Sequence, residues 1–564
     1  MTKKVTLTQI EATGIQNYIF GSNNLRQNVG ASELVAQATT QWIADVLREK
    51  GWKHNATWND NEGRLDLADQ SIADPGVQAE VVYAGGGNAL ILFEGDKTGL
   101  AIEFTQKLTF RALQEARGLS LVIEHLSFDW DSATLSKMHQ ELRRMVARRK
   151  MKRLVSLPLP GRAVTVACEF TGLPAVGLDK LDNDPISKEV WCKLENGFRV
   201  ANDRLHNILP GVKNSKYKYE FVRDFDLFGE KDESSYIAVI HADGNGMGKR
   251  FTSIREKYPL PADNTAYVRQ LRAFSQAMRE KSIDALRSTV DLLMNSRRLD
   301  KDGQEKFGGK VPILIKWDKI KKQSQEFLPF RPIVFGGDDV TFIAEGRLGL
   351  ALAAHYLHTV SQGGLLPESN LEKLSDPLYS RAGVAVVKSH YPFSRAYELA
   401  ESLAKSAKDQ IDYLADGKGT VMDWHFSTSG VILALSQVRA REYVAANGNS
   451  LLMRPVRFNL GQDPPVGSKY WRSWETFVKV AQTFQDEDPW SGKRNKLKAL
   501  QRALRSGPNA VEHFRANYDV EEMPAIPGQS TMTTTGWAGL DCGYFDAIEA
   551  SDFYVHLSNG EEAA

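Results

Sequence analysis

The sequence predicts an α+β fold in which a unit of strand, helix, hairpin, strand and helix occurs twice in tandem. Residues 236–430 contain the whole unit, and residues 1–128 repeat its two glycine-rich turns in the same order. Residues 129–235 and 431–564 have mainly helical patterns. Because a chain of 564 residues is too long for one hydrophobic core, we take these four ranges as the domains.

The second unit has the clearer pattern. Its predicted elements are a strand at 236–243, a helix over 264–294, a hairpin of two runs at 333–335 and 340–343, a strand at 382–387 and a helix over 393–414. The first strand ends in Asp243 and leads into a turn made of Gly244, Asn245, Gly246, Met247 and Gly248. At the tip of the hairpin stand Gly336, Gly337, Asp338 and Asp339. The unit therefore carries three acids at the ends of apolar strands.

The first unit repeats this frame without the acids. Residues 10–14 can be laid over 240–244, and residues 83–88 over 334–339. Two aligned motifs in the same order, each with apolar flanks, favour a structural duplication. In this alignment the residues that replace Asp243, Asp338 and Asp339 are Thr13, Gly87 and Asn88. We therefore expect a scaffold half that holds no catalytic metal.

Composition excludes several classes of protein. Lys and Arg number 71 against 70 Asp and Glu, so no bulk charge attracts nucleic acid and any such contact depends on local patches. No apolar run is long enough to span a membrane. The cysteines, Cys168, Cys192 and Cys542, lie far apart, which argues against a disulfide framework or a cysteine-built zinc site and favours the cytoplasm.

The three acids suit phosphodiester synthesis. Two divalent ions can activate an attacking hydroxyl and neutralise a leaving pyrophosphate, and Mg²⁺ is usually held by carboxylates and substrate phosphates. Asp243, Asp338 and Asp339 would supply the carboxylates for Mg²⁺ or Mn²⁺. The N–H groups of residues 244–248 could cradle the β- and γ-phosphates, with Lys408 as a point charge beside them. Glycines at the hairpin tip would let its backbone approach the substrate.

Each motif alone has a simpler explanation. A Gly-Gly-Asp-Asp sequence is usually a turn, Asp243 could be a helix N-cap, and Lys408 could lie on a solvated helix face. Their combination at the ends of apolar strands favours a metal and nucleotide site. The basic run at 143–153 fits either a solvated helix face or an RNA contact, and both interpretations stay open.

The motifs resemble the palm of GGDEF-type nucleotide cyclases and, more closely, the large subunit of type III CRISPR effector complexes, which carries two ferredoxin-like palms in tandem. Four anchors carry this resemblance: residues 14–34, Gly85-Gly86-Gly87-Asn88, Ala242-Asp243 with Gly336-Gly337-Asp338-Asp339, and Arg381-Ala382-Gly383 with Tyr391-Pro392-Phe393 and Ala407-Lys408. The resemblance covers about three quarters of the chain.

The resemblance implies that the second palm converts ATP into cyclic oligoadenylate when a complex with guide and target RNA and other effector subunits senses foreign RNA. Asp243, Asp338 and Asp339 would hold Mg²⁺, and Lys408 would contact the triphosphate. The chain departs from the family in three ways. It has no N-terminal HD nuclease motif, its zinc-knuckle region is reduced to residues 168–175 without paired cysteines, and Asn245 stands where an acid is common.

Two other functions stay open. The chain could be a stand-alone defence cyclase that makes a cyclic di- or oligonucleotide, or a non-enzymatic scaffold that holds RNA. Two adjacent acids that repel one another without a cation argue against the scaffold. The sequence gives no role for the inserted stretch at 295–330.

Overall fold

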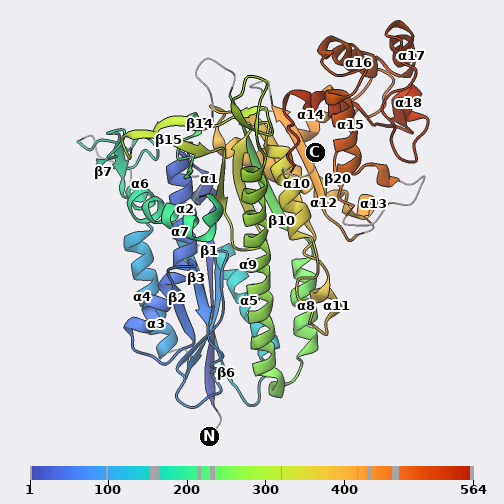
Figure 1. The fold of residues 1–564 in the computed structure, drawn as a ribbon. Helices are drawn as coiled ribbons and strands as arrows, with labels where there is room; N and C mark the ends of the chain where they lie inside the picture. The colour runs from blue at the N-terminus through green and yellow to red at the C-terminus, as the bar shows by residue number, and fades with distance from the viewer. Residues whose placement is uncertain are drawn as a thin grey trace.

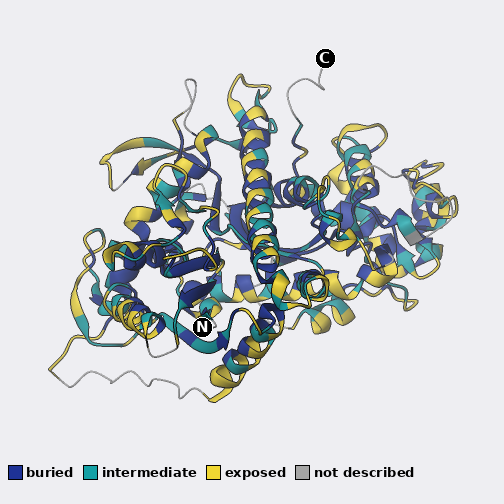
Figure 2. Cartoon of the chain, turned by 90° about the horizontal axis from the view of Figure 1, so that it is seen from below, coloured by how far each residue is buried: buried dark blue, intermediate teal, exposed yellow. Residues whose placement is uncertain are grey.

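The computed structural model describes residues 3–96, 99–152, 164–212, 218–228, 235–318, 320–415, 417–427, 434–459 and 469–558. Figure 1 shows two mixed domains side by side, with the C-terminal helices gathered at one flank of the second. Buried residues are concentrated in the sheets and in the inward sides of the helices, and exposed residues in the outer helices and loops (Figure 2). In the part of the chain that is described, no helix is long and apolar enough to cross a membrane.

The first palm is built on a four-stranded sheet in the order β4-β5-β1-β6. Its strands are β1 (Lys4–Thr13), β4 (Ala79–Gly85), β5 (Asn88–Glu94) and β6 (Ser120–Asp129). Its helices are α1 (Ile15–Phe20), α2 (Leu25–Ala38), α3 (Gln41–Glu49), α4 (Leu100–Glu115) and α5 (Leu135–Lys152), and a small hairpin joins β2 (Ala56–Asn59) to β3 (Arg64–Leu67). Alternation along β5 gives the sheet two apolar faces, because Ile91 and Phe93 pack towards α2, α3 and α4 while Leu90 and Leu92 pack in the cluster that includes α5.

The second palm has a six-stranded sheet in the order β16-β17-β10-β18-β19-β20. Its strands are β10 (Tyr236–Gly244), β16 (Phe330–Val334), β17 (Val340–Glu345), β18 (Ser380–Lys388), β19 (Val421–Ser427) and β20 (Val456–Arg457). Its helices are α8 (Met247–Lys257), α9 (Asn264–Asn295), α10 (Gly349–Val360), α11 (Glu372–Ser375), α12 (Phe393–Asp409) and α13 (Ile411–Ala415). Only β19 pairs in parallel, with β18, and the other neighbours are antiparallel. The predicted order of elements is thus confirmed.

The duplication is real, but its register differs from the alignment made on sequence. Both hairpins carry an irregularity after the same step, between Val81 and Tyr83 in one palm and between Pro332 and Val334 in the other. This feature confirms that Asn88 matches Asp339. The central strands then match two residues away from the sequence alignment. Gln9 pairs with Leu90 in the first palm, as His241 pairs with Thr341 in the second. Glu11 pairs with Asn88, and the same register continued one step past Ala242 and Val340 matches Asp243 to Glu11.

Two further features support this correction. Ala12 N donates to Gly87 O at 2.8 Å, as Gly244 N donates to Asp338 O at 3.1 Å. The turn glycines Gly14 (φ 69°) and Gly246 (φ 73°) are both left-handed caps, of α1 and α8. The residue that occupies the position of Asp243 in the first palm is therefore Glu11 and not Thr13, so the first palm does hold one carboxylate there.

Helix α5, assigned to the linker on sequence, packs on β1 and β6 and completes the first palm as α12 completes the second. The rest of the linker contains β7 (Ala175–Leu178), β8 (Pro185–Ser187), α6 (Lys188–Trp191), a π-helix at Cys192–Phe198, α7 (Arg199–Ile208) and β9 (Glu220–Phe221). Cys168 is buried in a small apolar cluster with Ile186, Val190 and Leu194.

The inserted stretch forms two small sheets. One consists of β11 (Arg297–Leu299), β12 (Glu305–Phe307) and β13 (Val311–Pro312). In the other, β14 (Leu314–Asp318) and β15 (Gln323–Leu328) join β9 of the linker. The insertion therefore ties the second palm to the region between the palms.

The C-terminal domain is helical, as predicted, with α14 (Leu435–Glu442), α15 (Trp474–Asp486), α16 (Arg494–Ser506), α17 (Pro508–Asn517), α18 (Met532–Thr535) and α19 (Phe545–Glu549), and a short pair of strands, β21 (Trp537–Ala538) and β22 (Asp541–Cys542). Residue 153, the last of the basic run, and residues 431–433, at the start of the predicted C-terminal domain, lie outside the described residues. Arg454, which is fully buried, pairs with Asp546 at 3.3 Å and Glu549 at 2.9 Å and anchors the domain beside β20.

The two palms meet through their helices. The ring of Phe20 on α1 stacks on Tyr397 of α12 with 3.8 Å between centroids. On the same helices, Gln16 donates a hydrogen bond to Glu401 at 2.7 Å. On the opposite side, α5 of the first palm faces α8 and α9 of the second. The α1–α12 contact is closed by stacked rings and hydrogen bonds.

Candidate active site

Asp243 lies at the end of β10, where the central strand of the second palm leaves the sheet. It is opposite Arg381 of β18, and the guanidinium group of Arg381 forms an ion pair with its carboxylate. The same guanidinium donates to the carbonyl of Gly244 at 3.2 Å and to Oδ1 of Asn245 at 2.9 Å. Arg381 therefore fixes both the acid and the turn that follows it.

Asp338 lies against this strand end. Its carbonyl accepts the hydrogen bond from Gly244 N, and a Cβ added to Gly244 would lie 2.9 Å from Cβ of Asp338. Only glycine at position 244 permits this approach, since real Cβ atoms do not come so close. The sequence prediction that the hairpin tip meets the end of the first strand is correct for Asp338.

The environment raises the pKa of both acids. Burial and then the negative charge of Asp243 raise the pKa of Asp338 to about 6. Burial also raises the pKa of Asp243, and the charge of Asp339 adds to this effect, whereas Arg381, His241 and Lys408 oppose it. Two partly buried carboxylates with raised pKa values mark a site that attracts positive charge.

Asp339 is directed to a different partner. Its carboxylate lies 3.3 Å from Nδ1 of His241, a residue of β10 whose ring is buried while Asp339 is about half exposed. Burial lowers the pKa of His241, but the hydrogen bond and charge of Asp339 outweigh it, so the net pKa is raised. His241 also contacts Thr341 Oγ1 at 3.4 Å and the ring of Tyr397 at 5.5 Å between centroids. His241 therefore holds Asp339 to the sheet.

The glycine-rich turn leads directly into α8. Gly246 caps this helix with no side-chain hydrogen bond, in a left-handed conformation. The first N–H groups of α8 consequently face outwards without a side-chain cap, which is the arrangement that receives anions at helix N-termini. Asn245 donates to Gly419 O at 3.1 Å and is held by Arg381. Asn245 thus fastens the turn to the end of the sheet.

Lys408 lies exposed in the last turn of α12, and its charge acts on the carboxylate of Asp243. At the hairpin tip, Gly336 needs its left-handed φ of 95°, and a Cβ on Gly337 would meet open space apart from a backbone nitrogen at 3.9 Å. The tip therefore has room beside it. The sequence-predicted residues thus gather at one end of the second sheet.

The described side chains do not, as they stand, form a group of three acids, histidines or cysteines able to hold a metal ion. Asp243 faces Arg381 and Asp339 faces His241, so two of the predicted ligands have protein partners. The donor set nevertheless fits a divalent cation, because carboxylate oxygens are hard ligands and Asp338 is partly buried beside another acid. Asp243 and Asp338, with Asp339 after a side-chain rotation, would hold it.

The first palm carries a reduced copy of the site. Glu11, at the position of Asp243, forms an ion pair with Lys150 of α5. Lys150 is the sixteenth residue of α5, and Lys408 is the sixteenth of α12. In place of the contact between His241 and Asp339, Gln9 donates to Asn88 Oδ1 at 2.6 Å. The acid and the lysine are thus duplicated, and the two hairpin acids are not.

Sequence reasoning missed His241 and Arg381 as site residues. Arg381 could be identified only from strand pairing, because its position opposite Asp243 depends on the register between β10 and β18. His241 is a lone polar residue in an apolar strand, two positions before Asp243, and therefore on the same face of the sheet. That spacing was the only sequence signal available for it.

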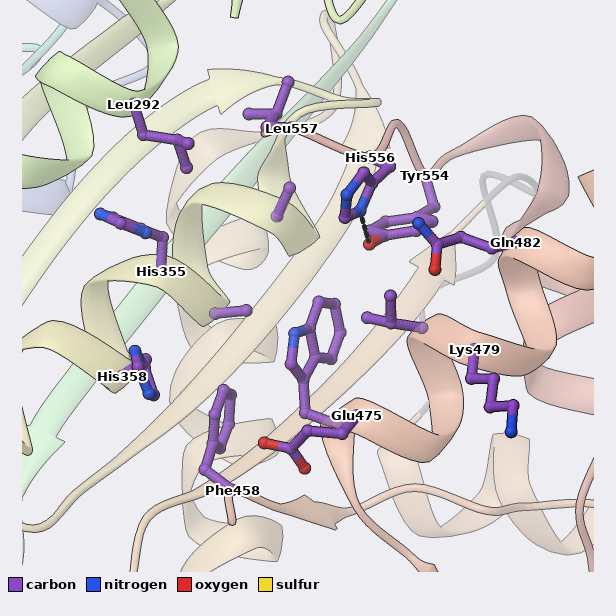
Figure 3. Close-up of a pocket in the computed structure, with 14 residues that line it drawn as sticks. Leu292, His355, His358, Phe458, Glu475, Lys479, Gln482, Tyr554, His556 and Leu557 are labelled. Carbon is purple, nitrogen blue, oxygen red and sulfur yellow. Dashed lines mark hydrogen bonds between the residues drawn. The ribbon is translucent and has the colours of Figure 1, made fainter. Parts of the chain in front are cut away.

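A separate cavity of about 400 Å³ lies between α10, α15 and the C-terminal residues (Figure 3). It contains three histidines, of which His355 contacts Ser288 Oγ at 2.8 Å and His556 contacts the hydroxyl of Tyr554 at 3.4 Å. Trp474 beside it stacks with Phe458 and Phe477, as expected for a core residue rather than a base-stacking platform. None of the three aspartates lines this cavity.

We expect Asp338→Asn to stabilise the metal-free protein at neutral pH. Folding raises the pKa of Asp338 from 3.8 to about 6, so the folded state takes up a proton and stability falls as the pH rises through this window. The charged carboxylate of Asp338 lowers the free energy of unfolding by up to about 3 kcal/mol at about pH 7.5, and by roughly half of that at about pH 5. The neutral amide of asparagine removes this loss. Calorimetric melting at both pH values tests this.

Asp69→Asn, at an exposed ion pair with Arg269, is the control and should change neither midpoint. An unchanged or lower midpoint for Asp338→Asn at about pH 7.5 would contradict the prediction.

The fold and the site together define a protein with two tandem palms, of which the second holds the acids. No protein-family model and no curated protein sequence matches this chain. Among solved structures, Csm1 of T. onnurineus is 13% identical with a TM-score of 0.48, over 97% of this chain and 70% of that one. A Csm1–Csm4 cassette in complex with cA4 is 13% identical with a TM-score of 0.47, over 97% and 69%. The Csm1–Csm4 subcomplex of the type III-A CRISPR-Csm interference complex is 12% identical with a TM-score of 0.46, over 97% and 70%.

Proposed function

We propose that the second palm is a nucleotidyltransferase that binds ATP with Mg²⁺ or Mn²⁺ and joins ATP into cyclic oligoadenylate with release of pyrophosphate. The observation that carries the proposal is the approach of Asp338 to the end of β10, where its carbonyl bonds Gly244 beside Asp243. Two acids brought together at a glycine-rich turn, with the charge of Lys408 acting on Asp243, suit an anionic substrate that arrives with cations.

Each residue has a part in this chemistry. Bound divalent cations would activate the attacking hydroxyl and neutralise the leaving phosphates. The uncapped N–H groups at the start of α8 and the ammonium group of Lys408 would hold the triphosphate. His241 positions Asp339 beside the site before a cation binds. Arg381 would keep Gly244 O and Asn245 Oδ1 as acceptors when a cation replaces its guanidinium group at Asp243.

The motif resemblance supports a place for the chain within a type III CRISPR effector complex, with guide and target RNA and other subunits as partners. A stand-alone defence cyclase would use the same site without them. One observation favours the non-enzymatic alternative, namely the ion pair that Arg381 forms with Asp243, because an arginine can neutralise an acid in a palm that binds no metal.

Incubation of the full chain with labelled ATP tests the proposal. The arms are Mg²⁺, Mn²⁺ or a chelator, each with and without RNA, and the readouts are pyrophosphate release, mass spectrometry of the product, and Mn²⁺ binding by electron paramagnetic resonance. We expect cation-dependent pyrophosphate and cyclic products. Neither product nor bound Mn²⁺ in the presence of nucleotide would leave the scaffold as the function.

A further inference from the structure

A second cavity, of about 330 Å³, lies where α5 of the first palm faces α8 and α9 of the second. Its size is that of a small-ligand pocket. Its lining comprises Ser136, His139, Gln140, Arg143, Arg144, Ala147, Phe251, Thr252, Arg255 and Tyr267. Three arginines and no acid contribute to it. We call it the α5–α8 cleft.

The arginines of the cleft have no ion pair with any acid that the structure describes. Within the described ranges, Arg143, Arg144 and Arg255 have no carboxylate partner, although Arg143 lies over the ring of Phe251 at 5.9 Å. Further along the same helix, Arg149 pairs with Glu124 at 3.0 Å and Lys150 pairs with Glu11. The basic run is therefore divided, with Arg149 and Lys150 paired to acids of the first sheet and Arg143 and Arg144 at the cleft. Like charges in one cavity repel, and an anion relieves that repulsion.

His139 gives an independent indication. Its side chain is buried, with 4% of its surface exposed, and its Nδ1 lies 2.9 Å from the hydroxyl of Tyr267. Its Nε2 has no hydrogen-bond partner in the part of the chain that is described. Burial and then the charges of Arg143 and Arg255 lower the pKa of His139 to about 3, so the ring is neutral. When the Tyr267 hydroxyl donates to Nδ1, Nε2 carries a proton that a ligand oxygen can accept. An unpartnered buried polar atom is unfavourable, and a hydrogen bond to a ligand would remove that cost.

The cleft is not a general result of the way the palms pack. Counted back from the matching lysines Lys150 and Lys408, His139 corresponds to Tyr397 and Arg143 to Glu401. At the α1–α12 contact these positions are filled by the stacked ring of Phe20 and the hydrogen bond from Gln16. At the α5–α8 contact, arginines and a histidine line an open space instead.

We propose that the α5–α8 cleft binds the phosphate groups of a nucleotide or short oligonucleotide. Guanidinium groups match phosphate oxygens in fork geometry and lose little hydration energy on binding them. The cleft uses residues other than the aspartates and Lys408, so the inference stands independently of the proposed function.

The test measures binding to the full chain by fluorescence anisotropy and calorimetry, without divalent metal, in the Lys408→Ala background so that the triphosphate site of the second palm contributes little. The probes are ATP, inorganic triphosphate, a short oligoadenylate RNA, and citrate as a polycarboxylate control. Arg143→Gln with Arg255→Gln is compared with Arg148→Gln and Lys152→Gln, which remove the same charge from exposed positions of α5 outside the cleft. Circular dichroism and melting confirm that all variants fold.

We expect the cleft variant to weaken phosphate binding about tenfold or more and to lower the salt dependence of the affinity, while the control variant changes the affinity less than about threefold. His139→Gln should weaken binding by a smaller factor. Binding of ATP and triphosphate would identify a nucleotide as the source, and binding of the RNA alone would identify a nucleic-acid backbone. Equal losses in the two double variants, citrate binding as tightly as triphosphate, or no binding of any phosphate probe would overturn the proposal.

Discussion

Replacing Asp338 and Asp339 together by alanine should abolish product formation while leaving the fold intact. The pair would hold the cations that neutralise the reacting phosphates, a contribution of several kcal/mol, so we expect a loss of about 10³-fold or more. The measurement is pyrophosphate release at saturating ATP and Mg²⁺ or Mn²⁺. Melting should show no loss of stability, because the substitution removes repulsion between Asp338 and Asp243.

A matched control uses the other hairpin. Asn88 corresponds to Asp339 in the first palm, and Asn88→Ala removes its hydrogen bond with Gln9 and its contact with Tyr83. That variant should keep most of the turnover. Undiminished turnover in the double aspartate variant would show that the chemistry lies elsewhere in the chain.

Lys408→Ala should raise the KM for ATP with a smaller effect on kcat. Its ammonium group lies on the exposed face of α12 and acts on Asp243, where the triphosphate would arrive. Loss of a charge-assisted contact of about 1.5–3 kcal/mol corresponds to a rise of about 10- to 100-fold. Steady-state kinetics and direct nucleotide binding both measure it.

Lys405, also exposed and about one turn earlier on the same helix, gives the control. Lys405→Ala removes an equal charge and should leave the KM within about twofold, as is usual for exposed lysines without partners. If both substitutions change the KM equally, or neither does, Lys408 is only a surface lysine.

The sequence predicted the tandem units and the approach of Asp338 to Asp243, because apolar strands and paired glycines leave strong local signals. It misplaced the central strand of the first palm by two residues. A shift of two keeps every side chain on the same face of a sheet, so the hydrophobic pattern cannot detect it. The register was fixed by hydrogen bonds from the hairpin, such as Ala12 N to Gly87 O, and these depend on tertiary structure.

The partners of the site residues were beyond sequence reasoning for a related reason. Arg381 meets Asp243 only because β18 pairs antiparallel with β10, far along the chain. Helix α5, which the sequence pattern assigned to the linker, packs on β1 and β6 through long-range contacts that sequence reasoning could not predict. Its basic run looked uniform in sequence, and only the fold pairs Arg149 and Lys150 with acids and places Arg143 and Arg144 at the cleft.

The ring of Tyr397 touches Phe20 of the N-terminal half on one side and His241 on another, and His241 holds Asp339. Three side chains thus form an unbroken line from the half without hairpin acids to one of the acids in the other half. Removing the N-terminal half would expose the ring of Tyr397 to solvent and weaken the support of His241 and Asp339. We therefore expect the C-terminal half alone to be inactive, because its site needs the N-terminal half packed against it.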